Sequence, residues 1–526
     1  MNPPDAQGRP AKRARFGRNV LYSGVSWFVP AAVAVIAVPV TVRGLGADGY
    51  GVVALVGAIA GYLGLLDLGL GRGIVRFLAM FVARNHGRTT RDALRLVLIW
   101  FAAVGAFGAS AMWLLAPWLA GHFLKVPPAL VAVTTIAFRI GGLAFALGML
   151  ASVFSLIPQA FLRYDLMSAL NAVLSSLSLA GPAVLVLMGY GILPIVWFSV
   201  ALNGVACIAW GAVGLRLVAS LPREGPPFSE HRREFIAFSA AVAANSIWTS
   251  IQTETSKVVV GVAGGTTQTT YFQVPNLISS RISGLLGSMS TVLLPTGSQL
   301  VAEGEHEQVL SLYERSSRLF FLLNASMTGA VVVFAAPLLA NWVGPVYGRT
   351  GGLAFTFLAL AAGLNATSMA ASHLNMAMGR PKVNLAFSLI NSFINLATVY
   401  FFTVRWGISG TAASGLLAAA AVPFFLHYSH RKVLGIGSWR VFSECYARIT
   451  LAVLTVGVVS WFTLRGLASS LIGTLALVAV VGAAGLAASA AFGAFTAEDW
   501  ASLRAVLSRR PAPTDGGADG HGSHGE

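Results

Sequence analysis

The feature of this sequence that most limits its fold is a succession of long apolar runs separated by short loops. A helix rises about 1.5 Å per residue, so a run of about 20 apolar residues crosses the roughly 30 Å hydrocarbon core of a bilayer. The mean hydropathy is +0.74 and 10% of the residues are charged, which is too apolar for a soluble domain. The pattern predicts an all-α polytopic membrane protein.

Fourteen such runs are present, and we expect each to form one transmembrane helix. Of the 35 Lys and Arg residues, 27 fall on the side of the membrane that holds the N-terminus, five fall in loops on the other side and three fall within runs. Positive residues accumulate in cytoplasmic loops, so this bias predicts a cytoplasmic-membrane protein with both termini in the cytoplasm. The runs lie at residues 20–42, 50–82, 93–120, 129–160, 166–189, 191–218, 235–261, 270–296, 312–342, 351–378, 383–404, 407–428, 444–464 and 467–495.

An internal repeat divides the chain. Residues 43–46 match residues 261–264, each ahead of a tyrosine, and residues 161–164 match residues 378–381, both at an offset of about 220. Six spans separate the copies, and an even number gives both copies the same orientation in the membrane. We therefore expect two parallel six-helix lobes followed by two further helices. The expected divisions are a basic cytoplasmic segment (1–19), the N-terminal lobe (20–218), a cytoplasmic linker (219–234), the C-terminal lobe (235–430), helices 13 and 14 (444–495) and a disordered cytoplasmic tail (496–526).

The sequence lacks the motifs of ATP hydrolysis and of metal catalysis. A GxGxG string spans Gly69–Gly73, but no strand pattern precedes it and it lies within an apolar run, so it does not predict a nucleotide-binding turn. The two cysteines, Cys207 and Cys445, predict neither a disulfide framework nor a metal site. The net charge of +16 is spread over many short loops, so it predicts contacts with anionic lipids and not with nucleic acid. We expect no enzyme activity and no cofactor.

A stretch near the N-terminus carries a family resemblance. The string GLGxxxYG is followed by an apolar helix, by LDLGL and then by an arginine; the residues concerned are Gly44, Gly46, Tyr50, Gly51, Leu66, Asp67, Gly69 and Arg76. This order resembles the polysaccharide-exporter and lipid-linked oligosaccharide flippase families of the multidrug/oligosaccharidyl-lipid/polysaccharide (MOP) superfamily. The resemblance implies a flippase that moves an undecaprenyl-type lipid-linked oligosaccharide across the cytoplasmic membrane by alternating access, for cell-surface polysaccharide biosynthesis. The implied partners are the anionic glycan substrate, membrane lipids, and a polysaccharide polymerase or glycosyltransferases.

Three cations within apolar runs are the candidate substrate-binding residues. A charge at membrane depth costs at least about 2.5 kcal/mol, so such residues indicate function. Arg139 and Arg281 lie about ten residues into their runs, near the midplane, and Lys257 lies in the outer half of its run. Guanidinium groups bind phosphate oxygens bidentately, so we expect these side chains to line a cavity between the lobes and to bind the anionic substrate. Arg72 and Arg76, where a run meets the cytoplasm, are candidates for the inner entrance or for interface anchors.

Two acids and one histidine are candidates for ion coupling or gating. Glu254 stands three residues before Lys257 on one helix face, where it forms either a structural ion pair or part of the substrate site. Asp67 lies in the inner half of its run, and His373 belongs to the residue type that titrates near neutral pH. These three groups are the candidates for coupling to H⁺ or Na⁺; the alternatives are that Asp67 neutralises a nearby arginine and that His373 forms a structural hydrogen bond between helices.

Three other functions remain open. An ion-coupled multidrug or small-cation exporter of the same superfamily would favour buried acids, whereas cations outnumber acids in these runs by three to two. A membrane glycosyltransferase or polymerase would need a sizeable outer loop, and the expected outer loops are short. A non-transporting scaffold of a polysaccharide-synthesis complex would retain its function when Arg139 and Arg281 are replaced by alanine.

Overall fold

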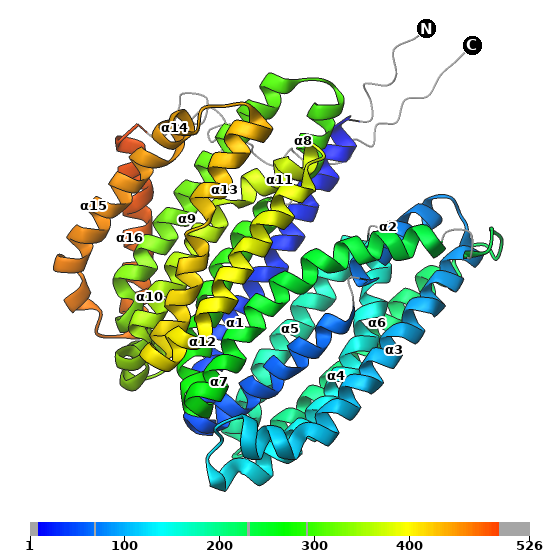
Figure 1. Ribbon diagram of the computed structural model, residues 1–526, viewed down its shortest axis with the longest axis horizontal. Helices are drawn as coiled ribbons and strands as arrows, with labels where there is room; N and C mark the ends of the chain where they lie inside the picture. Colours follow the sequence, from blue (N-terminus) through cyan, green and yellow to red (C-terminus); the bar gives the residue numbers. More distant parts are fainter. Residues whose placement is uncertain (1–8, 68–69, 162, 229–231, 291–292, 494–526) are drawn as a thin grey trace, which may run out of the picture.

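The computed structural model describes residues 9–67, 70–161, 163–228, 232–290 and 293–493, and the regular elements in these ranges are all helical. The expected all-α fold class is confirmed (Figure 1). The tail expected to be disordered, 496–526, lies outside the described residues. The helices are α1 (Arg9–Leu63), α2 (Leu70–Ala83), α3 (Gly87–Trp118), α4 (Val131–Ala160), α5 (Tyr164–Leu187), α6 (Ile192–Ala219), α7 (Arg232–Ser290), α8 (Leu293–Ala302), α9 (His306–Trp342), α10 (Pro345–Thr367), α11 (Met369–Ala377), α12 (Pro381–Ala419), α13 (Val422–Tyr428), α14 (Ser438–Val441), α15 (Arg448–Thr463) and α16 (Leu471–Ala491).

Three of the longest helices are broken by a glycine with positive φ. The breaks are at Gly46 in α1 (φ 70°), Gly265 in α7 (φ 79°) and Gly407 in α12 (φ 59°). A side chain at such a φ costs roughly 1–2 kcal/mol, which glycine avoids. All three breaks fall in or next to loops expected from the sequence. Ten segments of the described residues are long and apolar enough to cross a membrane, and some contain such a break, so the count of fourteen spans stays a prediction.

Hydrogen bonds show that α12 folds back on itself at Gly407. The hydroxyls of Thr403 and Thr411 are 2.8 Å apart, and the Asn395 Nδ2 group donates to Ser414 Oγ at 3.2 Å. Residues before the break therefore pair with residues after it in reverse order, as in an antiparallel helix pair. Polar side chains form these bonds because no water is available at membrane depth to satisfy them.

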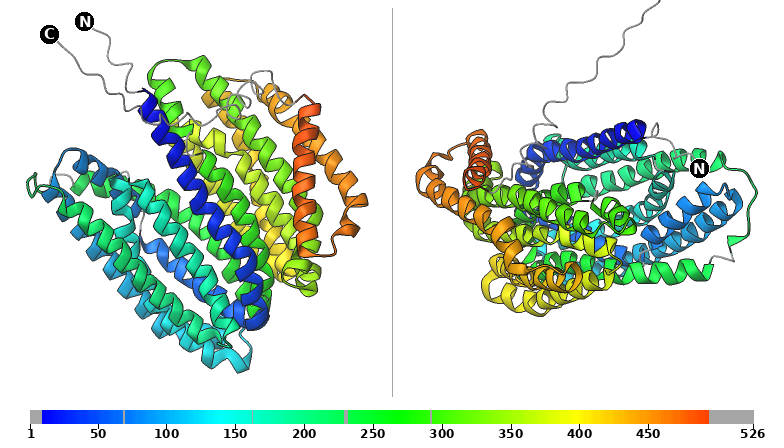
Figure 2. Two further views of the ribbon diagram at one scale, coloured as in Figure 1. Left: turned by 180° about the vertical axis from the view of Figure 1, so that it is seen from behind. Right: turned by 90° about the horizontal axis from the view of Figure 1, so that it is seen from above.

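The helices form two groups that meet at one end and diverge at the other (Figure 1). Helices α2–α6 make one group and α8–α16 the other; the described ends of the chain lie at the diverging end. The first half of α1 runs between the groups, as the left view in Figure 2 shows. The two-lobed architecture expected from the sequence is thus present.

Apolar packing ties α1 and α7 to both groups. The first half of α1 buries Ala34 and Val38 against Val331 of α9. Conversely, Phe235 at the start of α7 packs among the side chains of α2, with its ring edge-on to that of Phe77 at 5.5 Å. Contacts therefore cross the expected boundary between lobes, and the division at 219–234 stays a prediction.

Candidate functional site

Hydrogen bonds around Asp48, which follows the break in α1, join α1 to α7 at the end where the helix groups meet. Asp48 Oδ1 accepts from the hydroxyls of Thr266 and Thr267, each at 2.5 Å, just past the break in α7. The Thr270 hydroxyl donates to the Ala47 carbonyl at 2.5 Å. We call this set of contacts the seal. Sequence reasoning missed Asp48, although its position two residues after a glycine turn at the repeat boundary was visible.

Basic residues from the expected outer loops extend the seal. The Arg43 guanidinium donates to the carbonyls of Val343 and Trp342, at 2.9 and 3.0 Å from Nε and Nη2. The Lys125 ammonium donates to the Ala263 carbonyl at 2.8 Å. These carbonyls lie at the C-terminal ends of α9 and of the first half of α7. The last C=O groups of a helix lack intrahelical partners. The bonds therefore close this end of the molecule across segments far apart in the sequence.

Glu254 and Lys257 form an ion pair on the first half of α7. Lys257 Nζ lies 3.0 Å from both Glu254 carboxylate oxygens, and both side chains are 16% exposed. The pair faces the second half of α1: a Cβ added to Gly61 would lie 2.8 Å from Glu254 Cδ, and the Tyr62 hydroxyl is hydrogen-bonded to Thr255. The i, i+3 pair expected from the sequence is therefore formed, at a contact between α1 and α7.

Arg281 lies on the second half of α7 and has no hydrogen bond or ion pair with the described part of the chain. Its side chain is half-buried. This helical stretch begins at Thr266, four residues before the expected start at residue 270, so Arg281 lies about 22 Å along the helix from the seal, past the expected midplane. The cation is thus held at membrane depth without a counter-ion among these residues, which suits it to an anionic ligand.

Arg139 is not brought together with the other two cations. On α4 it shares a stripe with the exposed residues Ile136 and Leu143, at i, i+3 and i+7 spacing. The opposite face of α4 packs on α1, where a Cβ on Gly141 would lie 2.5 Å from Val56 Cγ1. The guanidinium stacks 5.2 Å from the Trp113 ring of α3, and its buried Nε has no hydrogen-bond partner among the described residues. Arg139 therefore points away from the contact between α1 and α7.

The other predicted residues lie on α2, on α11 and on the segment between α1 and α2. Arg72 and Arg76 lie on α2, but their side chains are outside the described residues. Asp67 ends the short 3₁₀ segment Gly64–Asp67 that separates α1 from α2. His373 of α11 lies with its Nε2 atom 3.0 Å from Ser290 Oγ at the end of α7. None of these placements tests a role in coupling.

A two-lobed helical bundle with a sealed end and cations held at membrane depth defines a polytopic membrane transporter fold. The fold is similar to that of the lipid II flippase MurJ in an inward closed conformation, at 13% identity and TM-score 0.70, over 93% of this chain and 100% of that one. It is also similar to a multidrug resistance MATE family transporter of the MOP superfamily in an inward-facing conformation, at 15% identity and TM-score 0.62, over 81% of this chain and 100% of that one.

The family follows from the sequence match. Residues 40–350 match the model of the polysaccharide biosynthesis protein family, and the chain belongs to this family. A putative O-antigen transporter of Shigella flexneri is 20% identical over 431 residues, which is 80% of this chain and 98% of that protein. The expected resemblance to a polysaccharide biosynthesis family is thereby confirmed.

Proposed function

We propose that the protein is a flippase that moves a lipid-linked oligosaccharide or polysaccharide precursor across the cytoplasmic membrane by alternating access between its lobes. The observation that carries this proposal is the asymmetry of the bundle: hydrogen bonds close one end, while the helix groups diverge at the other (Figure 1). The family and the names of its relatives, an O-antigen transporter and a lipid II flippase, support this class of substrate.

The proposed orientation places the seal at the outer surface and the diverging end in the cytoplasm. It rests on the positive-inside rule, because the basic loops gather at the end that holds the chain termini. In this orientation the conformation receives substrate from the inner leaflet. Release outside then requires the bonds between Asp48 and the threonines of α7 to break while the other end closes.

Arg281 is the residue that we propose to bind the phosphate of the substrate. No described residue balances its charge, it lies on α7 and not on the exposed stripe of α4 that carries Arg139, and a guanidinium binds phosphate oxygens in pairs. Lys257 joins it when Glu254 is protonated or binds another cation, which would link substrate binding to H⁺ or Na⁺. Asp67 and His373 are further candidates for that coupling. Arg72 and Arg76 would attract the anionic substrate at the inner entrance, and Arg139 is left out of the site.

The experiment compares variants in cells that depend on this protein for one surface glycan. We expect Arg281→Ala to lower surface glycan at least tenfold and to accumulate the lipid-linked precursor, with Arg281→Lys retaining part of the activity. The matched control is Arg465→Ala, because Arg465 stacks on Trp461 at 3.6 Å beyond the end of α15. Full export by Arg281→Ala at normal membrane abundance would contradict the proposed role of Arg281.

The exporter of small organic cations is the second candidate, favoured by the similarity to the MATE transporter fold. The charges do not suit it: Lys257 already neutralises Glu254, and Arg281 would repel a cation. Ethidium efflux from cells that express the protein, with surface glycan unchanged by its deletion, would establish this function in place of the flippase.

A further inference from the structure

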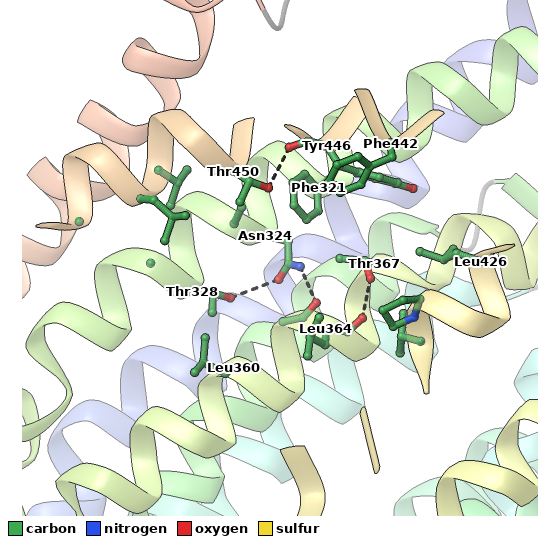
Figure 3. A pocket seen from close by; sticks show the side chains of 18 of the residues that line it. Phe321, Asn324, Thr328, Leu360, Leu364, Thr367, Leu426, Phe442, Tyr446 and Thr450 are labelled. Carbon is green, nitrogen blue, oxygen red and sulfur yellow. Dashed lines mark hydrogen bonds between the residues drawn. The ribbon is translucent and has the colours of Figure 1, made fainter. Parts of the chain in front are cut away.

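Between the helices α13–α15 and the pair α9–α10 lies an open cavity of about 990 Å³ that the proposed transport route does not use (Figure 3). Its floor is formed by α9 and α10, with Phe321, Gly329 and Leu364 among the lining residues. Its walls are formed by α13 and α15, with Leu426 and Val458 among the lining residues. We call this cavity the α15 groove.

The α15 groove extends across most of the hydrocarbon core. Its lining residues on α14, α15 and the π-helical segment between them run from Trp439 to Phe462 and recur every three or four positions. At the helical rise of about 1.5 Å per residue this distance is roughly 35 Å. One complete face of this span therefore borders the groove, and the groove is long enough for an extended hydrocarbon chain.

Three of the polar side chains along the groove, those of Asn324, Thr367 and Thr450, already bond to the protein (Figure 3). The Asn324 Nδ2 group donates to the Gly363 carbonyl at 2.7 Å, and the hydroxyls of Thr450 and Thr367 donate to carbonyls of their own helices at 2.8 and 2.6 Å. These three donors need no ligand acceptor, so a hydrocarbon chain can cover them without leaving them unpaired; the Tyr446 hydroxyl and His430 Nδ1, which also border the groove, have no partner among the described residues.

Positive charge lies at one mouth of the groove, at the end where the helix groups diverge. Arg431, in the π-helical segment Ser429–Leu434, lines the mouth with His427 and Trp439. Arg431 is exposed and makes no ion pair with any described residue, whereas Arg440 lies 3.5 Å from a Glu314 carboxylate oxygen. Trp439 is 77% exposed, as is typical of a tryptophan at headgroup level. A cationic mouth on an apolar groove is complementary to an anionic amphiphile.

Close packing of α9 on α10 separates the groove from the contact between the lobes. Cβ atoms added to Gly348 and Gly352 would each lie 2.7 Å from an α9 alanine, so glycine allows the two helices to touch along their length. On α9, Val331 and Ala335 pack toward α1 and α7, while the groove lies on a different face. A molecule whose headgroup sits between the lobes would need to pass through this wall to place its tail in the groove.

We propose that the α15 groove binds an anionic phospholipid of the leaflet at that end, as a resident lipid distinct from the transported one. Arg431 and His427 hold the phosphate, and an acyl chain lies along the groove between α15 and the pair α9–α10. The lipid fills the space between the pair α9–α10 and the helices α13–α15. This proposal does not depend on the flippase activity.

The test measures lipids bound to the purified full-length protein by native mass spectrometry. Phosphatidylglycerol and phosphatidylcholine with identical acyl chains are added at equal concentration, with a polyprenyl phosphate as third probe. We expect retention of phosphatidylglycerol about tenfold above phosphatidylcholine, a difference of about 1.4 kcal/mol. Arg431→Ala should bring the two to parity, while Lys432→Ala, the exposed neighbour that does not line the groove, should keep the preference.

A second pair of variants tests the groove itself. Gly457 faces the groove, and an added Cβ would meet Val333 at an ordinary 3.8 Å. Gly457→Ala should therefore bind lipid as the parent does, whereas Gly457→Leu should fill the groove and lose both phospholipids at an unchanged unfolding temperature. Equal retention of the two phospholipids by the parent, or displacement of phosphatidylglycerol by polyprenyl phosphate at equal concentration, would overturn the proposal.

Discussion

Replacing Asp48 should weaken the seal enough to change which end of the transporter is open. Its Oδ1 atom accepts two hydroxyl bonds from α7, and a hydrogen bond to a charged group contributes about 1.5–3 kcal/mol. The two bonds share one oxygen, so we take about 2.7 kcal/mol for the pair. Asp48→Ala should then shift the equilibrium about 100-fold toward conformations open at this end. Asp48→Asn, which keeps one neutral acceptor, should shift it about tenfold.

Thiol labelling from outside the cell measures this shift. Ala47→Cys is introduced into a variant in which Cys207 and Cys445 have been replaced. The rate at which the new thiol reacts with a membrane-impermeant maleimide is then measured. We expect the rate to rise about 100-fold with Asp48→Ala and to stay unchanged with Asp165→Ala, whose carboxylate pairs with Arg163 in the loop before α5. An unchanged rate in the Asp48→Ala protein, with normal stability, would refute the reasoning about the seal.

Three further predictions concern local contacts. Glu254→Gln leaves the half-buried Lys257 without its partner and should lower the free energy of unfolding by about 1–3 kcal/mol, measured by thermal unfolding in detergent. Adding Lys257→Met to this variant should restore most of the lost stability. Gly265→Ala should lower the free energy of unfolding by roughly 1–2 kcal/mol, because the φ of Gly265 is +79° and the added Cβ would lie 2.5 Å from the Lys125 carbonyl oxygen. Gly57→Ala, with open space around it, should be neutral or stabilising in the same assay. Arg139→Ala should keep surface glycan within about twofold of the parent, because its side chain stacks on α3 away from the lobe contact; a tenfold loss would place it in the substrate site.

The sequence alone determined the helical class, the approximate helix ends and the local ion pair. Helices that cross a bilayer must satisfy their backbone internally, so apolar runs of fixed length reveal them. The breaks at Gly46, Gly265 and Gly407 follow local turn preferences. The bond between Glu254 and Lys257 depends only on i, i+3 spacing.

Tertiary structure decided which face each helix turns toward the interior. In a membrane both the lipid-facing and the packed faces of a helix are apolar, so hydrophobic periodicity does not distinguish them. The sequence therefore predicts that Arg139 faces a cavity, whereas in the structure Arg139 shares one face of α4 with the exposed residues Ile136 and Leu143. The partners of Asp48 lie more than 200 residues away in the sequence, and the α15 groove is lined by residues from Phe321 to Phe462, so only the packing of these helices brings them together.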